Sequence, residues 1–431
     1  MTSTFYSSLR LFILYIILLL LCESNLVAQD TDKARRWIQE LCSNPYAGRG
    51  YVKHGANKAA EYLSAQMKQI GLKPLPNMST NSNNPYLQSY TFDINTHPNE
   101  IRCEVDKRKM IPGIDFLVGP GSPSANGTYT LLHFNPNDSV EKQLLYKKIR
   151  KGFAPQEVIV LHKTSSRKHP VWDSIKLHGA PSLLLFTEEK KLTHSLRTTV
   201  DEVPSLIFID SVLQMADKLT IQFENQYLKN NINHNVLGYL PAKKSKKYIV
   251  FTAHYDHLGM MGNQAIFPGA SDNASGTAMV LMLADYFKHK KNDDNILFIL
   301  FSGEEAGLLG SEYFVANTPI ALSDIKMLIN IDIMGDAEKG ITVVNGETWK
   351  EQFDELVAIN QRKKYLPEVR IRGKASNSDH HHFSENNVPS FFIYSMGGKG
   401  YYHDIFDTPD NCALTNYLQV AQLLIDFVSK Q

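Results

Sequence analysis

The 431-residue chain lacks several features that would place it in a specialised class of protein. Its 45 Lys and Arg nearly balance its 44 Asp and Glu. The chain therefore has no excess of positive charge that would indicate a nucleic-acid partner. Only 4 cysteines are present, without a Cys-x-x-Cys pair, which is too few for a disulfide framework and does not suit a thiolate metal site. Internal repeats and low-complexity segments are also missing. What remains is the composition of an ordinary globular protein with a large core.

Long uninterrupted runs of apolar residues are rare in this chain. Its one long apolar run, Leu11–Leu21, is shorter than the roughly 20 residues that a membrane helix needs. A basic residue before the run and Ala28 after it are typical of a secretory signal. We therefore expect residues 1–28 to be a signal peptide and the protein to be secreted, periplasmic or held at the cell envelope. Two alternatives stay open: a permanent N-terminal anchor, and a lipid anchor at Cys22, which the leucine before it disfavours.

The hydrophobic pattern divides the chain into two kinds of sequence. Residues 55–70 have apolar side chains at helical spacing, and the stretch ends at a glycine, which predicts a helix in an N-terminal part covering residues 29–111. Residues 112–228 contain short strands between Lys-, Ser- and Pro-containing loops, without a cluster of catalytic residue types, and are expected to form an inserted β-rich domain. From residue 229 to 431, apolar strands alternate with helical segments.

The strands of this last part are apolar throughout. They are Asn235–Leu240, Tyr248–Ala253, Asn295–Ser302, Met327–Ile333 and Ser390–Tyr394. A strand without alternation is buried on both faces, as in a sheet covered by helices on both sides. We therefore expect an α/β fold, a three-layer α/β/α sandwich with a mostly parallel central sheet, in addition to the inserted domain.

Carboxylate and imidazole side chains follow these strands where each one ends. They are His254 and Asp256, Asp272 at the start of a helix, Glu304 and Glu305, Asp332, and His403 in the last loop. Ligands of open α/β sheets bind beyond the carboxyl ends of the strands, so we expect these side chains to meet at one edge. Any one of them alone could be a helix cap or a solvated turn, but their joint arrival indicates a metal site.

Nitrogen and oxygen donors without a thiolate suit paired zinc ions, or manganese or cobalt, rather than structural zinc. A pair of metals shares one carboxylate, for which Asp272 is the natural candidate. Of the adjacent Glu304 and Glu305, one can bind metal while the other moves protons.

In this order the motifs resemble those of the co-catalytic zinc aminopeptidases, which include bacterial leucyl aminopeptidases and, more distantly, glutamate carboxypeptidases and glutaminyl cyclases. The motifs are Ala253-His-Tyr-Asp256, Gly269-Ala-Ser-Asp-Asn-Ala-Ser-Gly276, Gly303-Glu-Glu-Ala-Gly-Leu-Leu-Gly-Ser311, Asn330-Ile-Asp332, and His403 with Asp407-Thr-Pro. The turn Ala47-Gly-Arg-Gly50 also resembles the family's N-terminal segment. The resemblance covers Ala34–Phe92 and Asn235–Phe427.

The resemblance implies a role for each residue of the set. One Zn²⁺ is held by His254 and Asp332, the other by Glu305 and His403, and Asp272 bridges them. Glu304 is the catalytic base and acid, and Asp256 orients the first histidine. The peptide bond after the bridging Asp272 is expected to be cis. Ser378-Asp-His380 matches a further motif, whereas His257 and Tyr402 receive no role.

The inserted region resembles a protease-associated domain in three segments, Gln156–His162, Gly179–Phe186 and Val203–Ile209, with an unrelated β domain as the alternative. For the whole chain the resemblance implies a zinc-dependent exopeptidase acting on peptides, an aminopeptidase that hydrolyses N-terminal residues through a water bridging two metals. A carboxypeptidase or dipeptidase of the same fold, a glutaminyl cyclase and a non-catalytic binding ectodomain stay open. A carboxypeptidase would need an arginine such as Arg372 to hold the substrate carboxylate.

Overall fold

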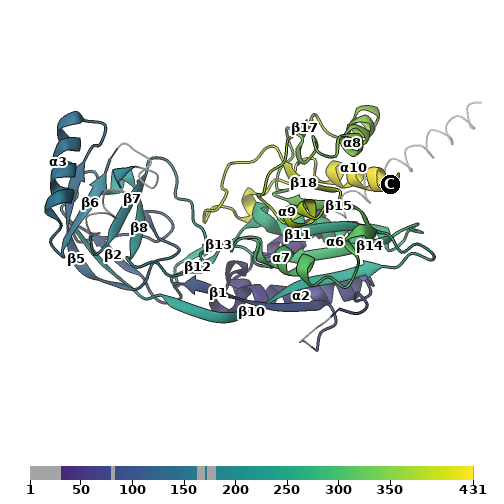
Figure 1. Cartoon of the computed structure of the whole chain (residues 1–431), viewed down its shortest axis with the longest axis horizontal. Helices are drawn as coiled ribbons and strands as arrows, with labels where there is room; N and C mark the ends of the chain where they lie inside the picture. The colour runs from purple at the N-terminus through teal and green to yellow at the C-terminus, as the bar shows by residue number, and fades with distance from the viewer. Residues whose placement is uncertain (1–30, 79–82, 163–169, 172–180, 431) are drawn as a thin grey trace, which may run out of the picture.

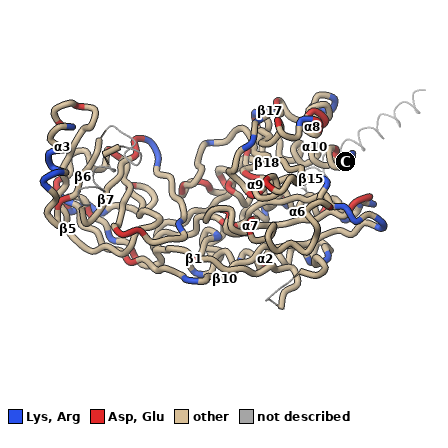
Figure 2. Tube along the Cα trace, in the orientation of Figure 1, with Lys and Arg blue, Asp and Glu red and all other residues tan. Residues whose placement is uncertain are grey.

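The computed structural model of the chain describes residues 31–78, 83–162, 170–171 and 181–430. The expected signal peptide, residues 1–28, and Cys22 lie outside these ranges. Among the helices that are described, none has the length and apolarity to cross a membrane. Figure 1 shows a larger unit with the sheet and most helices, and a smaller one, which we call the outer unit, formed by residues 102–223. Figure 2 shows both charge signs scattered over both units.

An eight-stranded sheet forms the centre of the larger unit. In spatial order its strands are β1 (Leu87–Thr96), β10 (Gln226–Leu240), β14 (Asn295–Phe301), β11 (Tyr248–His254), β15 (Ile325–Asp332), β18 (Ser390–Ser395), β16 (Ile341–Val344) and β17 (Val369–Ile371). The α/β class is confirmed, but the sheet is mixed rather than mostly parallel. Strands β14, β11, β15 and β18 run parallel, whereas β1, β10 and β16 are antiparallel to their inner neighbours. Continuous apolarity indicated burial of each strand but carried no information about its direction.

Both faces of the sheet pack against hydrophobic side chains. One face is covered by α2 (Gly55–Ile70), α6 (Gly276–Phe287), α8 (Lys350–Lys363) and α10 (Tyr417–Val428), and the other by α7 (Leu309–Ala316) and α9 (His380–Glu385). Along β11, Ile249 and Phe251 contact the first set of helices, while Val250 between them belongs to the second cluster. Burial on both sides explains why these strands have no polar alternation.

The outer unit has two small sheets and its own hydrophobic clusters. The first contains β3 (Arg108–Lys109), β2 (Arg102–Val105), β9 (Lys218–Phe223), β5 (Ala125–Phe134) and β6 (Glu157–Leu161); the second contains β4 (Phe116–Val118), β8 (Ser205–Ile209) and β7 (Leu184–Glu188). Helices α3 (Ser139–Lys151) and α5 (Asp210–Leu213) complete it. Strands β2 and β3 precede residue 112 but pair with β9 or with each other, so this sheet begins before the boundary expected from sequence.

A two-stranded ribbon joins the units. Strands β1 and β10 pair antiparallel from Leu87↔Val236 to Thr96↔Gln226, with a shift of register between Phe92 and Ile94. Figure 1 shows the ribbon running from the larger unit to the outer unit. Only the end of β10, from residue 236, also pairs with β14. The sequence predicted that end alone, because the first half of β10 is polar.

Arg49 connects the N-terminal segment to the loops of the larger unit. It is fully buried, and its guanidinium donates to the carbonyl oxygens of Leu41 (3.1 Å), Tyr255 (2.7 Å), Pro268 (2.6 Å) and Gly269 (2.7 Å). The neighbouring glycine at position 50 lies so close to the backbone of residue 259 that a Cβ there would be 2.5 Å from its Cα. Arg49 therefore fixes the segment just after His254 and the segment just before Asp272.

We expect Arg49→Met to lower the free energy of unfolding by roughly 3 kcal/mol, because the buried carbonyl oxygens lose a charged donor. Chemical denaturation of the metal-free protein measures this effect without a contribution from bound ions. Arg36→Met, at an exposed position of the same N-terminal segment, is the matched control and should change stability by less than about 0.5 kcal/mol. Equal stability of the two variants would contradict the role given to Arg49.

Candidate metal centre

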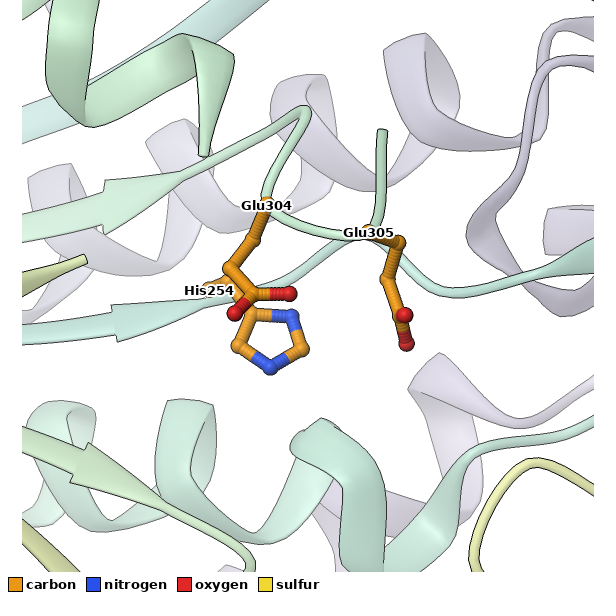
Figure 3. Close-up of side chains that lie close together, drawn as sticks. All are labelled: His254, Glu304 and Glu305. Atoms are coloured by element: carbon orange, nitrogen blue, oxygen red, sulfur yellow. The ribbon is translucent and has the colours of Figure 1, made fainter. Parts of the chain in front are cut away.

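Two parallel strands bring the first pair of candidate ligands together. His254 is the last residue of β11 and Asp332 the last of β15, the strand beside it. Their side chains meet beyond the sheet, with 3.2 Å between His254 Nε2 and Asp332 Oδ1. The turn after β14 supplies Glu304 and Glu305, whose side chains both extend toward the side on which His254 lies (Figure 3). Ligand atoms of His254, Glu304 and Glu305 lie within 4.8 Å of one another.

Asp272 lies between the two candidate histidines. One carboxylate oxygen, Oδ1, is 3.3 Å from His254 Nε2, and the other, Oδ2, is 3.2 Å from His403 Nε2. The Asp407 carboxylate fixes this turn by accepting the backbone N–H groups of Ser271 and Asp272 at 2.9–3.1 Å. The peptide bond from Asp272 to the next residue is cis, as the resemblance implied. A carboxylate with one oxygen toward each histidine has the arrangement of a bridging ligand.

His403 comes from the loop after β18, where its backbone has a left-handed φ of 59°. Its Nε2 lies 3.1 Å from Glu305 Oε2. The structure thus brings all five ligand candidates together around Asp272, with His254 and Asp332 on one side and His403 and Glu305 on the other.

Hydrogen bonds fix the tautomer of both histidines. Nδ1 of His254 donates to the backbone carbonyl of Asp256 at 3.1 Å, and Nδ1 of His403 donates to the carbonyl of His194 at 3.0 Å. In the neutral ring, Nε2 then carries a lone pair, which faces carboxylate oxygens only 3.1–3.3 Å away. Without a further proton these atoms repel one another. A divalent cation among them satisfies nitrogen and oxygen lone pairs together, so these residues fit a metal centre.

Asp256 acts on His254 differently from the expectation. Its backbone oxygen, not its carboxylate, is the nearer acceptor, since Oδ1 is 3.7 Å from Nδ1. The carboxylate instead accepts from the Tyr51 hydroxyl at 3.1 Å and from the Glu304 backbone N–H at 3.3 Å. Asp256 therefore connects the histidine to the turn of the adjacent glutamates.

The protonation of the cluster is strongly perturbed. Burial raises the pKa of Glu304 well above its ordinary value, with His254 opposing and Glu305 reinforcing the effect. Burial would lower the pKa of His403, but Glu305 and Asp272 outweigh it and raise the pKa to about 11. Without a metal the cluster thus holds protons that compensate its carboxylates, and a bound cation would displace them.

The cluster opens onto a pocket of about 300 Å³. It is lined by His254, Asp272, Glu304, Asp332, Ile333, Arg372, Asn377, Phe392, Tyr394, Tyr402 and His403. The Tyr402 ring stacks on His403 with 3.7 Å between the centroids, and Arg372 donates to the Tyr394 hydroxyl at 3.2 Å. Figure 2 shows acidic segments on the side of the larger unit that faces the outer unit.

The Ser378-Asp-His380 motif contacts the cluster through Ser378, which hydrogen-bonds to Asp332. The Ser378 hydroxyl donates to Asp332 Oδ2 at 3.1 Å and contacts the Asn330 amide at 2.7 Å. Asp379 and His380, at the start of α9, are buried, and neither belongs to a group of candidate ligands within the described residues.

The sequence did not predict the contact of His257 with Glu305. His257 is fully buried, and its Nδ1 lies 2.7 Å from Glu305 Oε1, while the other carboxylate oxygen of Glu305 faces His403. This hydrogen bond leaves Oε2 of Glu305 facing His403. Ligand atoms of His257, Asp272 and Glu305 also lie within 4.8 Å of one another. His257 follows the motif Ala253-His-Tyr-Asp256 directly but is not part of it. No further spacing in the sequence distinguished it from a histidine with a purely structural role.

We expect His257→Ala to weaken the binding of the Zn²⁺ nearest Glu305 by roughly 10-fold or more, because the carboxylate loses the donor that orients it. Competition with a chromophoric chelator measures this affinity. His257→Gln, which keeps an N–H donor, should recover part of the lost zinc affinity. His289→Ala, at an exposed position, should bind zinc with wild-type affinity. Unchanged zinc affinity in the alanine variant would show that the contact has no orienting role.

Comparison with known proteins shows what the segment that carries this cluster is similar to. Residues 235–428 match the model of peptidase family M28. Leucine aminopeptidase 1 of Arthroderma otae is 28% identical over 219 residues, 47% of this chain and 58% of its own length. Aminopeptidase YwaD of Bacillus subtilis is 35% identical over 109 residues, 25% of this chain and 23% of the relative. The matched segments therefore span between about a quarter and somewhat more than half of these relatives.

Solved structures share the fold over nearly the whole chain. A zinc aminopeptidase from Bacillus subtilis superposes with a TM-score of 0.68 at 17% identity, covering 93% of this chain and 94% of that one. An aminopeptidase from Aneurinibacillus sp. strain AM-1 has a TM-score of 0.61 at 19% identity, covering 91% and 92%. The family model covers every ligand candidate, which confirms the resemblance inferred from the motifs. The segment 235–428 is thus similar to peptidase family M28.

Proposed function

We propose that this protein is a zinc-dependent aminopeptidase that removes N-terminal residues from peptides. One observation carries the proposal: the Glu304 side chain lines a pocket beside five clustered ligand candidates. A carboxylate in that position can exchange a proton with a water molecule and a substrate in the pocket. The aminopeptidase names of two relatives, and the match of residues 235–428 to peptidase family M28, support the same activity.

We propose two ions. His254 and Asp332 would hold one, His403 and Glu305 the other, and Asp272 would bridge them, with Zn²⁺ as the expected metal and Mn²⁺ or Co²⁺ as alternatives. When bound, zinc supplies Lewis acidity, which polarises a carbonyl oxygen and acidifies water.

The protein's own residues supply proton transfer and orientation. Glu304 takes a proton from the attacking water and returns it to the amine nitrogen that leaves when the peptide bond breaks. The Asp256 carboxylate, through the Glu304 backbone N–H, fixes the turn from which this side chain projects. Tyr402, stacked on His403, closes one wall of the pocket and limits the water that reaches the substrate.

A carboxypeptidase or dipeptidase is the second candidate, favoured by Arg372. This guanidinium lines the same pocket and is a cation that could hold the carboxylate of a short peptide. The direction of cleavage therefore has to be decided by experiment.

The remaining organisation is part of the proposal. On both faces of the sheet, helices contribute side chains to a hydrophobic cluster. This packing supports a three-layer α/β/α arrangement. The separate sheets of the outer unit, which begin with β2, support an inserted protease-associated-like domain. The sequence predicts this domain over residues 112–228, between the parts 29–111 and 229–431 of the peptidase domain. We propose secretion to the periplasm or cell envelope from the sequence of residues 1–28.

We expect Glu304→Gln to bind zinc like the wild type but to lower kcat by roughly 10²–10⁴-fold, because glutamine cannot accept the proton. Single-turnover kinetics and metal analysis on the same sample measure both quantities. Glu312→Gln, an exposed position in the first turn of α7, serves as control and should leave kcat unchanged. A Glu304→Gln variant with nearly full activity would exclude this residue as the base.

Removal of the metal tests the function as a whole. We expect chelation to abolish hydrolysis of aminoacyl-4-nitroanilides and free peptides, and stoichiometric Zn²⁺ to restore it, because the ligand cluster needs a cation. N-acetylated versions of the same peptides should resist cleavage. Removal of C-terminal residues from the acetylated peptides would instead establish the carboxypeptidase, and the absence of any hydrolysis with zinc bound would exclude both peptidases.

A further inference from the structure

The loop that carries His403 is held by the outer unit. It follows β18 and contains glycines with positive φ at positions 397, 398 and 400, so it has little regular structure of its own. Its partners include an irregular segment of the outer unit, residues 191–194, between β7 and β8. The two segments are about two hundred residues apart in the chain, and hydrogen bonds join them at several points.

Lys191 makes the polar contacts at one end of this junction. Its ammonium group donates to the carbonyl oxygens of Gly400 and Tyr402, each at 2.6 Å, and pairs with Asp404 Oδ2 at 3.1 Å. These three acceptors lie on both sides of His403 in the sequence. The Asp404 side chain is 9% exposed and that of Lys191 33%, so the pair is partly shielded from water. A single cation thus joins the parts of the loop before and after the histidine.

The backbone of His194 makes the contacts at the other end. Its N–H donates to the His403 carbonyl at 3.1 Å, and its carbonyl accepts the proton of His403 Nδ1 at 3.0 Å. The second bond directs Nε2 at Asp272 and Glu305. The His194 ring stacks on Phe267 of the larger unit with centroids 4.7 Å apart, which fixes the carbonyl that selects the tautomer.

A hydrophobic contact supports the same loop from another part of the outer unit. Ile405 packs against the cluster that fills the outer unit and its contact with the larger one. The turn at Gly113 is so close that a Cβ there would lie 2.9 Å from Ile405 Cγ2. The residues following His403 are therefore held by packing as well as by hydrogen bonds.

The other histidine does not depend on the outer unit. His254 ends a central strand, its Nδ1 bonds to Asp256, and its neighbours Asp272 and Asp332 belong to the larger unit. The two halves of the candidate centre thus differ in what positions them.

We propose that the outer unit positions the ligand His403, with Lys191 as the positioning residue, so that the affinity of one of the two zinc sites depends on this contact between the units. The inference rests on the proposed zinc function. It gives the outer unit a role in loading the metal held by His403 and Glu305. The metal held by His254 and Asp332 is connected to the outer unit only through the shared Asp272, whose turn is fixed by Asp407 of the same loop.

Zinc binding by the full chain tests this proposal. In Lys191→Met, one Zn²⁺ should bind with wild-type affinity, while the free Zn²⁺ that half-saturates the other site should rise roughly 10-fold or more. Lys191→Arg, which keeps the charge and the donors, should restore affinity to within about 3-fold of the wild type. Lys190→Met, at the exposed adjacent position, is the matched control and should bind both ions normally.

Hydrogen exchange of the metal-free variants gives a second readout. Peptides covering residues 400–406 should exchange faster in Lys191→Met than in the wild type, whereas peptides covering β11 should not change. Equal zinc affinity at both sites and equal exchange in the loop would overturn the proposal while leaving the zinc peptidase intact. A wild type that binds fewer than two ions would overturn the proposed function and this inference with it.

Discussion

The concentration of negative charge at the end of the sheet is the constraint on which the rest of the site depends. Asp272, Glu305 and Asp332 are each almost fully buried, and their oxygens lie 3.1–3.3 Å from the two histidine Nε2 atoms. Burying several carboxylates so closely is unfavourable unless cations or protons compensate them. The surrounding protein therefore has to hold these groups against their mutual repulsion.

Different parts of the fold meet this requirement. Strands β11 and β15 hold His254 and Asp332, because each residue is still paired with a neighbouring strand, His254 with β14 and Asp332 with β18. The turn of Asp272 has no strand to support it and is fixed instead by the Asp407 carboxylate and, at its start, by Arg49. Positions supplied by loops thus need charged partners, whereas positions at strand ends do not.

The sequence predicted helix α2 at its observed bounds from an apolar period. It predicted the five ligand candidates from local motifs, of which those of His254, Glu305 and Asp332 lie at the end of an apolar strand or just after it. The direction of β16, the polar half of β10 and the partner of His257 had no local signal. The contact of Lys191 with Gly400 depends on how two distant segments meet in space, and neither segment has a pattern that indicates the other.

The ribbon of β1 and β10 has a mechanical consequence. Because β1 and β10 are paired along their length, a movement of the outer unit relative to the larger one has to bend or twist the ribbon as well as strain its contacts with the His403 loop. Its shift of register after Phe92 is the natural place for bending. Tyr90, two residues earlier, donates to the carbonyl of Ser302, immediately before the glutamate-bearing turn. Rocking of the outer unit would therefore apply a torque beside this turn as well as to the loop on the far side of the pocket.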